Sequence, residues 1–198
     1  MKLDESVLSN APRYSNALGM RELNLSKFSL TDLDAFQDYR DLYDSIRLAH
    51  NRLTSDSFTS FGLLQRLQFL DLSHNRIESF SSSFTIKVPN VEDLVLENNR
   101  IASVQDLESL KNLKKLTTLI LIGNPITEIE GYPCNVLEAL PQVRYLDYQK
   151  KNFYFTQSGS SSDETEQTDN IDKDEVRRQL QNATSLVEAM RLRSLLEE

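Results

Sequence analysis

The chain has only two histidines, His50 and His74, and they occupy matched hexapeptides, LAHNRL and LSHNRI, 24 positions apart. Paired imidazoles are common in metal sites and in acid–base catalysis. A zinc-type site needs a third and a fourth ligand nearby, and acid–base catalysis needs a pocket that holds the substrate. The elements that carry the two hexapeptides therefore decide whether the pair does chemistry or only reflects a repeat.

The two hexapeptides belong to a longer series of internal repeats. Four segments align without gaps: IRLAHNRL, LDLSHNRI, LVLENNRI and LILIGNPI. Leucine or isoleucine falls at fixed offsets before an asparagine, which is the leucine-rich repeat pattern L-x-x-L-x-L-x-x-N. The aligned asparagines, spaced by 24, 24 and 25 residues, are Asn51, Asn75, Asn99 and Asn124. A degenerate copy at residues 23–28 precedes these four repeats, and a terminal copy at 143–148 follows them.

The repeat spacing predicts an α/β leucine-rich-repeat solenoid of about five repeats plus a terminal strand. In each L-x-L the two leucines point to one side of a short strand and the middle residue to the other. Stacked strands then form a concave parallel β-sheet, and each asparagine amide bonds backbone groups of neighbouring turns in a structural ladder. Apolar residues at about every third position of 101–116 predict helical or 3₁₀ turns on the convex side.

The predicted organisation has three parts. Residues 1–156 form the repeat domain, with an N-terminal cap at 3–14 and a C-terminal cap at 132–147, because an open solenoid must seal both ends of its core. Residues 157–170 are rich in serine, glycine and acids and predict an acidic flexible linker. Residues 171–198 predict a separate amphipathic helical segment. A helix this short is marginal alone, so we expect it to dock on the solenoid or on a partner.

Composition argues against several classes of protein. The net charge is −8, of which residues 157–198 contribute −5, and this disfavours the chain as a lone, strong nucleic-acid binder. Cys134 is the only cysteine, which excludes an internal disulfide and favours a reducing compartment. No run of about 18 apolar residues occurs, so we expect no membrane span. With no P-loop, dinucleotide fingerprint, HExxH or CxxC motif, we expect neither an enzyme nor a bound cofactor.

The concave face is the predicted partner-binding surface. It carries apolar side chains on a face that should be exposed to solvent (wet), and this is typical of a protein-binding surface. Acids also outnumber bases on this face, which favours a partner helix that is partly apolar and partly basic. The predicted partner-binding residues are Glu22, Asn24, Arg47, Phe69, Asp71, Asp93, Val95, Glu97, Ile120 and Ile122.

Both histidines fall in the slot before the ladder asparagine, in a column with Lys27, Asn98 and Gly123. Neighbouring parallel strands lie about 4.8 Å apart, so the imidazoles are expected to be near neighbours. Lys27 and Asn98 are poor metal ligands, and an open sheet edge is no pocket. We therefore expect no metal and no catalytic site. The histidines are expected to be contact residues at the rim of the groove.

The segments that flank the repeats resemble the A-prime protein family of the U2 small nuclear ribonucleoprotein. The N-terminal block has Tyr14, Asn16 and Ala17 leading into an Arg-Glu-Leu stretch at 21–23. The solenoid ends with PQVRYLD at 141–147, and the distal segment carries Ala-x-x-Leu-x-Glu and Arg-Leu-x-x-Leu-Leu between residues 183 and 196. The resemblance implies a non-enzymatic spliceosome component in the nucleus. Its groove would hold a helix of an RNA-recognition-motif partner of the B-double-prime type.

The resemblance further implies that the pair binds a U2 small nuclear RNA stem-loop, mainly through the partner. The bases expected to contact RNA at the rim are Arg21, Lys27, Lys150 and Lys151. Other U2 particle proteins are expected to bind through the C-terminal helical segment. The alternative is a phosphatase-regulatory or acidic-nuclear-phosphoprotein-like repeat protein. Such proteins share the repeats and the cap but would not be expected to carry the Tyr-x-Asn-Ala block or the distal helix.

Overall fold

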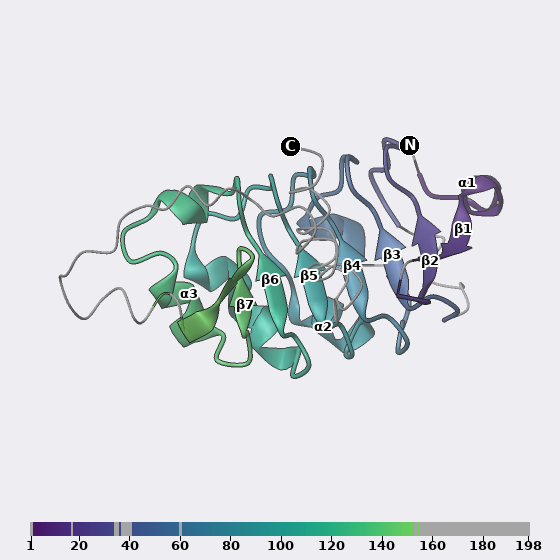
Figure 1. Ribbon diagram of the computed structural model, residues 1–198. Helices are drawn as coiled ribbons and strands as arrows, with labels where there is room; N and C mark the ends of the chain where they lie inside the picture. The colour runs from purple at the N-terminus through teal and green to yellow at the C-terminus, as the bar shows by residue number, and fades with distance from the viewer. Residues whose placement is uncertain are drawn as a thin grey trace, which may run out of the picture.

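The computed structural model describes residues 2–16, 18–33, 36, 41–59, 61–152 and 154 of the 198-residue chain. The predicted acidic linker and C-terminal helical segment lie outside these described residues. Within the described part, the strands stand side by side in one row, with turns and short helices behind them (Figure 1). The predicted leucine-rich-repeat solenoid is confirmed.

The described residues form an eight-stranded sheet whose strand order follows the chain. Its strands are β1 (Arg13–Ser15), β2 (Arg21–Asn24), β3 (Ser45–Arg47), β4 (Phe69–Asp71), β5 (Asp93–Val95), β6 (Thr118–Ile120), β7 (Tyr145–Leu146) and β8 (Gln149–Lys150). Strands β2 to β7 pair in parallel, as the repeats predict. The two ends differ from that prediction, because β1 folds back on β2 and β8 folds back on β7 as antiparallel strands.

The middle residue of each strand pairs with its counterpart one repeat on, so the aligned leucines form one column. The members of this column are Leu23, Ile46, Leu70, Leu94, Leu119 and Leu146, and each is at most 1% exposed. Side chains alternate along a strand, so the residues on either side of this column point to the opposite, concave face. The register therefore matches the alignment made from the sequence.

The ladder asparagines bond neighbouring turns of the solenoid. The Asn75 amide nitrogen donates to the Leu48 carbonyl of the preceding repeat at 3.0 Å and to the Leu72 carbonyl at 2.9 Å. Its Oδ1 accepts from the Leu53 amide at 3.0 Å. Asn51, Asn99 and Asn124 make equivalent bonds one repeat apart. Each buried asparagine satisfies backbone groups that no strand can reach.

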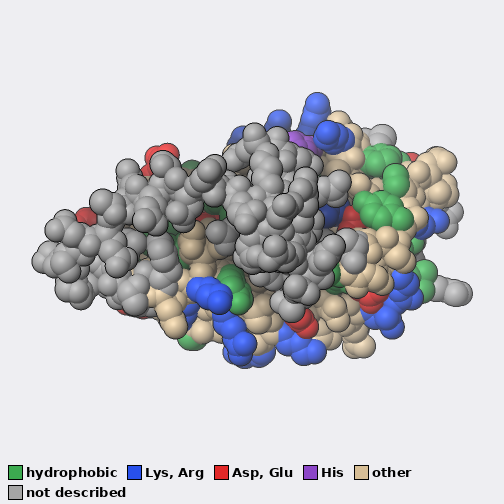
Figure 2. Space-filling model, viewed as in Figure 1, with side chains coloured by type: hydrophobic (Ala, Val, Ile, Leu, Met, Phe, Trp, Pro, Cys, Tyr) green, Lys and Arg blue, Asp and Glu red, His purple; other side chains and the backbone are tan. Residues whose placement is uncertain are grey.

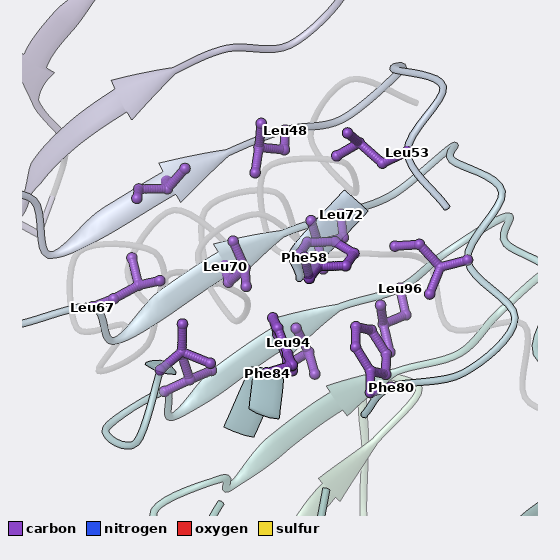
Figure 3. Close-up of a cluster of buried hydrophobic side chains, with 14 of the residues drawn as sticks. Leu48, Leu53, Phe58, Leu67, Leu70, Leu72, Phe80, Phe84, Leu94 and Leu96 are labelled. Carbon is purple, nitrogen blue, oxygen red and sulfur yellow. The ribbon is translucent and has the colours of Figure 1, made fainter. Parts of the chain in front are cut away.

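Short helical segments line the convex side, as the three-residue apolar spacing predicts. They are η2 (Ser55–Phe58), α2 (Ser82–Lys87), η3 (Val104–Asn112) and η4 (Pro125–Glu128). Phe58 packs edge-on against Phe84 with ring centroids 5.1 Å apart, and against Phe61 at 5.9 Å. Figure 3 shows Phe58 and Phe84 beside the leucines that β4 and β5 send into the core. These rings fill the space between the sheet and the convex turns.

Caps seal both ends of the core at the predicted places. Helix α1 (Glu5–Asn10) begins at Asp4, whose carboxylate accepts the Val7 amide at 2.8 Å, an N-cap bond. At the far end, α3 (Cys134–Ala139) precedes β7, and Cys134 is a free, half-buried thiol. The capping side chains buried in the main core are Leu3, Val7, Leu8, Ala11, Leu137, Leu140, Val143 and Leu146. No helix in the described part of the chain is both long and apolar enough to cross a membrane.

Candidate functional site

Two rows of side chains cross the concave face, one on each side of the leucine column. The first row consists of Glu22, Ser45, Phe69, Asp93 and Thr118, and the second of Asn24, Arg47, Asp71, Val95 and Ile120. Eight of the ten predicted partner-binding residues lie in these rows. The other two, Glu97 and Ile122, follow the ends of β5 and β6. The register thus gathers all ten on one face.

A polar cluster centred on Glu22 occupies the N-terminal end of this face. The Glu22 carboxylate, 1% exposed, accepts the Tyr14 hydroxyl at 2.6 Å and the Asn16 amide at 3.1 Å. It also accepts the Ser45 hydroxyl at 3.0 Å and Arg47 Nε at 2.7 Å. Tyr14 reaches Glu22 because β1 pairs antiparallel with β2 and places the two residues opposite each other. The cluster therefore ties the N-terminal hairpin to the first two repeats.

Arg47 extends this cluster into the next repeat. Its Nη1 lies 3.8 Å from Asp71 Oδ2, and its guanidinium carbon lies 5.5 Å from the centroid of the Phe69 ring. The other Asp71 oxygen accepts the Ser73 hydroxyl at 2.6 Å and the Ser73 amide at 3.0 Å. Arg47 therefore compensates two carboxylates and covers an aromatic ring, an arrangement that fixes its side chain.

The pKa shifts in this cluster follow from burial and hydrogen bonding. Burial alone raises the pKa of Glu22, but the bond from Tyr14, the charge of Arg47 and the bonds from Asn16 and Ser45 outweigh it, so the pKa lies below its ordinary value. Burial, followed by the hydrogen bond to Glu22 and its charge, raises the pKa of Tyr14. Tyr14 thus remains a proton donor and Glu22 an acceptor across the neutral range.

An apolar cluster of Phe69, Val95 and Ile120 occupies the centre of the face. All three are at most 3% exposed in the whole chain, and Leu18, Met20 and Tyr148 pack against them. The expectation that these three side chains would be wet is therefore wrong: they pack on one another and on residues from both end hairpins. Ile122, by contrast, is 43% exposed, as expected for a side chain on a wet face.

Several contributors to this face were missed by the analysis of the repeats alone. Tyr148 donates to Glu97 Oε1 at 2.5 Å, which links the C-terminal hairpin to the fourth repeat. Tyr14 and Asn16 were recognised only as part of a motif, without a role. Residues at both ends of the solenoid fold back over the concave face, and a repeat alignment contains no signal for such a reversal of chain direction. The antiparallel hairpins place them there.

The four bases proposed to contact RNA do not form one group. Arg21 begins β2 and its Nε bonds Asp44 at 3.2 Å, whereas Lys27 is exposed just beyond β2. Lys150 is exposed in β8, and the Lys151 ammonium donates to the Leu137 carbonyl at 3.1 Å. The two pairs therefore lie at opposite ends of the sheet.

The two histidines stack face to face at one edge of the sheet. Their ring centroids are 4.1 Å apart and their planes differ by 11°. Both residues are exposed, and both have positive φ angles, 56° and 54°. Among the described residues, no group of three or more His, Cys, Asp or Glu side chains is placed to hold a metal ion.

The positive φ extends along the whole column that contains the histidines. Lys27, Asn98 and Gly123 have φ angles of 68°, 52° and 74°. Asparagine and histidine tolerate this left-handed conformation better than most residues, and glycine tolerates it best. A Cβ on Gly123 would lie 2.4 Å from Asn98 Oδ1 and 3.3 Å from its backbone nitrogen. The repeat therefore imposes this backbone conformation on every member of the column.

Comparison with known proteins agrees with this architecture. The leucine-rich repeat family model matches residues 1–176. The U2 small nuclear ribonucleoprotein A′ of Homo sapiens is 31% identical over 150 residues, which are 76% of this chain and 58% of that protein. The probable homologue of Caenorhabditis elegans, 31% identical over 151 residues, has the same coverage. The chain thus spans 58% of the length of these curated relatives.

A solved structure extends the comparison to the fold. A chain in the crystal structure of the Drosophila melanogaster SNF/U2A′ complex matches with a TM-score of 0.72 and 30% identity. The match covers 80% of this chain and 90% of that one. These relatives decide against the alternative families that the sequence left open. The chain belongs to the leucine-rich repeat family and, within it, to the U2 small nuclear ribonucleoprotein A′ proteins.

Proposed function

We propose that this chain is a non-enzymatic component of the U2 small nuclear ribonucleoprotein that acts in the nucleus during pre-mRNA splicing. Its concave face would hold an RNA-recognition-motif protein, and the pair would bind a U2 small nuclear RNA stem-loop. The observation that carries this proposal is the match to 90% of a chain solved in complex with SNF. The curated relatives named above are U2 particle proteins rather than enzymes.

The chemistry of the face supports an amphipathic, partly basic helix as the element it receives. The apolar cluster of Phe69, Val95 and Ile120 crosses three strands, with Val95 and Ile120 directly paired and Ile122 exposed beside it. Asp93 and Glu97 flank the cluster with no Lys, Arg or His ion pair among the described residues. An exposed apolar side chain on a packed apolar floor, flanked by acids, suits a helix with an apolar stripe and basic flanks.

The polar cluster contributes rigidity rather than charge. Arg47 is already paired with both Glu22 and Asp71, and the three residues lie on three neighbouring strands. A side chain fixed before binding loses little conformational entropy when a partner arrives. We infer that this end of the face pre-organises the groove, while the exposed Ile122 and the two acids that lack an ion pair in the described part of the chain, Asp93 and Glu97, supply most of the affinity.

A matched pair of substitutions tests the groove. Ile122→Lys places a charge on the concave face, whereas Ile86→Lys makes the same change in α2, where Ile86 is 69% exposed on the convex side. We expect Ile122→Lys to weaken binding of the RNA-recognition-motif protein by about tenfold or more, since burying an unpaired charge is costly. Calorimetric titration without RNA measures this loss. Equal affinities for the two variants would refute the groove assignment.

Two further variants address the centre of the face. Phe69→Ala and charge reversal at Asp71 should also weaken pairing. Both side chains are buried, so circular dichroism must first verify that each variant is folded. A folded Phe69→Ala variant with unchanged partner affinity would remove the apolar cluster from the interface.

The RNA contribution is tested separately from pairing. Lys27→Glu should reduce RNA binding by the pair more than it reduces pairing, because Lys27 is exposed at the rim and lies outside the two rows that form the groove. A gel shift with a U2 RNA stem-loop measures the first effect and calorimetry the second. An unchanged gel shift would exclude Lys27 as an RNA contact.

A further inference from the structure

A row of basic side chains follows the histidine column along one edge of the sheet. Three arginines, Arg52, Arg76 and Arg100, come directly after the ladder asparagines, one in each successive repeat. Their backbone amides each donate to the preceding turn, to Leu30, Leu53 and Ile77, at 2.8–2.9 Å. The three residues are exposed and in register. We call this row, together with Lys27, His50 and His74, the basic edge.

The charge on this edge is the opposite of that of the chain as a whole. The chain carries a net charge of −8, yet four bases and the two histidines gather here. Figure 2 shows a histidine surface, in purple, at the upper margin of the molecule beside lysine and arginine side chains in blue. With neighbouring strands about 4.8 Å apart, the four bases span about 14 Å.

The bases of this edge also differ in their pairing from those at the start of the strands. There, Arg21 and Arg66 both bond Asp44, at 3.2 and 3.1 Å. On the basic edge, Lys27, Arg52 and Arg76 form no ion pair with any described residue. Arg100 lies 3.7 Å from Glu78, but both side chains are largely exposed, and such a pair exchanges readily with another anion. The described part of the chain therefore leaves the basic edge available to an external anion.

The stacked histidines favour one class of anionic ligand. Burial, followed by the charges of His74 and Lys27, keeps the pKa of His50 below its ordinary value, so His50 is neutral at pH 7. A neutral imidazole has one donor and one acceptor nitrogen. Asn98 adds an amide 3.4 Å from His74 Nε2. Such groups match the ribose 2′-hydroxyl, which both donates and accepts hydrogen bonds. An acidic peptide, by contrast, would need only the positive charges of Lys27 and the arginines.

We propose that the basic edge is a contact surface for the sugar–phosphate backbone of RNA. The arginines and Lys27 would meet phosphates, and the histidines with Asn98 would meet ribose hydroxyls or base edges. This inference rests on the proposed function, because the partner brings the RNA to the concave face that this edge borders. It adds a direct RNA contact by residues of the second to fourth repeats.

The main test compares two double variants with the same change in charge. Arg52→Glu/Arg76→Glu alters the basic edge, and Lys114→Glu/Lys115→Glu alters exposed bases in the turn before β6, at the opposite edge. The probe is a fluorescein-labelled hairpin of U2 RNA, titrated by anisotropy against the full chain with its RNA-recognition-motif partner. Pairing without RNA is measured for both variants by calorimetry and should stay unchanged.

The arginine variant should lose at least about tenfold in RNA affinity at about 50 mM salt. The slope of log K against log salt should also fall by about 1.5, since each phosphate contact contributes roughly 0.7–0.9. The lysine variant should stay within about twofold of the wild type. Equal losses in the two variants, or an unchanged slope in the arginine variant, would overturn the inference and leave an acidic protein as the ligand of this edge.

A second variant separates the histidines from the charges. His50→Asn/His74→Asn keeps the required backbone conformation, because Asn98 already adopts it with φ of 52°. We expect a loss of affinity of a few fold with little change in slope, because the variant keeps Lys27 and the three arginines that would meet phosphates. If the wild-type chain does not bind the RNA-recognition-motif protein, the proposed function is refuted.

In that case, RNA titration of the chain alone at about 50 mM salt still tests the basic edge. Weaker binding by the arginine variant than by the lysine variant would support the inference, and equal binding by the two would reject it.

Discussion

Replacing Asn75 with alanine tests the ladder on which the whole concave face depends. Asn75 lies in the middle of the ladder and is 8% exposed. The substitution leaves the buried Leu53 amide without its acceptor, which is Asn75 Oδ1 at 3.0 Å. It also removes donors 3.0 Å from the Leu48 carbonyl and 2.9 Å from the Leu72 carbonyl. A buried donor without a partner costs roughly 1–3 kcal/mol.

The substitution costs less free energy at the Leu48 and Leu72 carbonyls than at the Leu53 amide, because each carbonyl keeps a second donor. The Leu48 oxygen keeps the Asn51 amide at 2.8 Å, and the Leu72 oxygen keeps the Asn99 amide at 3.0 Å. Each lost bond then contributes only its net value, about 0.5–1.5 kcal/mol. Together these losses predict that Asn75→Ala lowers the free energy of unfolding by about 3 kcal/mol, a large part of the 5–15 kcal/mol typical of a domain.

Urea unfolding followed by circular dichroism measures this loss. With an m value of about 2 kcal/mol/M, the midpoint should move down by about 1.5 M while m stays constant. Asn112→Ala, at an exposed position at the end of η3, is the control and should change stability by less than about 0.5 kcal/mol. A loss below about 1 kcal/mol in Asn75→Ala, or a loss equal to that of the control, would refute the ladder as a source of stability.

Three other outcomes follow from the concave face and its edge. The pKa of Glu22 is lower in the folded state than in the unfolded state, where it is about 4.3. The ionised carboxylate therefore stabilises the fold above the unfolded pKa, and this stabilisation is lost as the pH falls through the folded pKa. Glu22→Gln should flatten the acid side of a plot of urea midpoint against pH. Gly123→Ala should cost about 1–2 kcal/mol in urea unfolding, because φ is 74° and the new Cβ would meet Asn98. Tyr148→Phe should lower the free energy of unfolding by about 1 kcal/mol through loss of the hydrogen bond to Glu97. Because burial and Glu97 raise the pKa of Tyr148, an ultraviolet titration of this variant should show one fewer tyrosine that ionises only at high pH.

Sequence reasoning succeeded where the repeat itself carries the information. The register of β2 to β7 follows from aligning the asparagines, because a period of 24 or 25 residues places equivalent backbone atoms side by side. The 3₁₀ turns of η3 follow from apolar residues at every third position. The same reasoning was wrong about the wetness of Phe69, Val95 and Ile120. Leu18, Met20 and Tyr148 pack against them, and the hairpins that carry these side chains fold back from the two ends of the solenoid.

The sequence by itself determined the solenoid, the buried leucine column, the asparagine ladder and the shared column of His50 and His74. Hydrophobic alternation and a constant period dictate these features through backbone geometry alone. Only the tertiary structure decided which side chains meet: Tyr14 with Glu22, Tyr148 with Glu97, and the two imidazoles in a stack. It also decided which of the described bases are paired with acids and which are exposed without an ion pair. Such pairings depend on the reach and rotamer of individual side chains and on how the end hairpins fold back, and no repeat period encodes either.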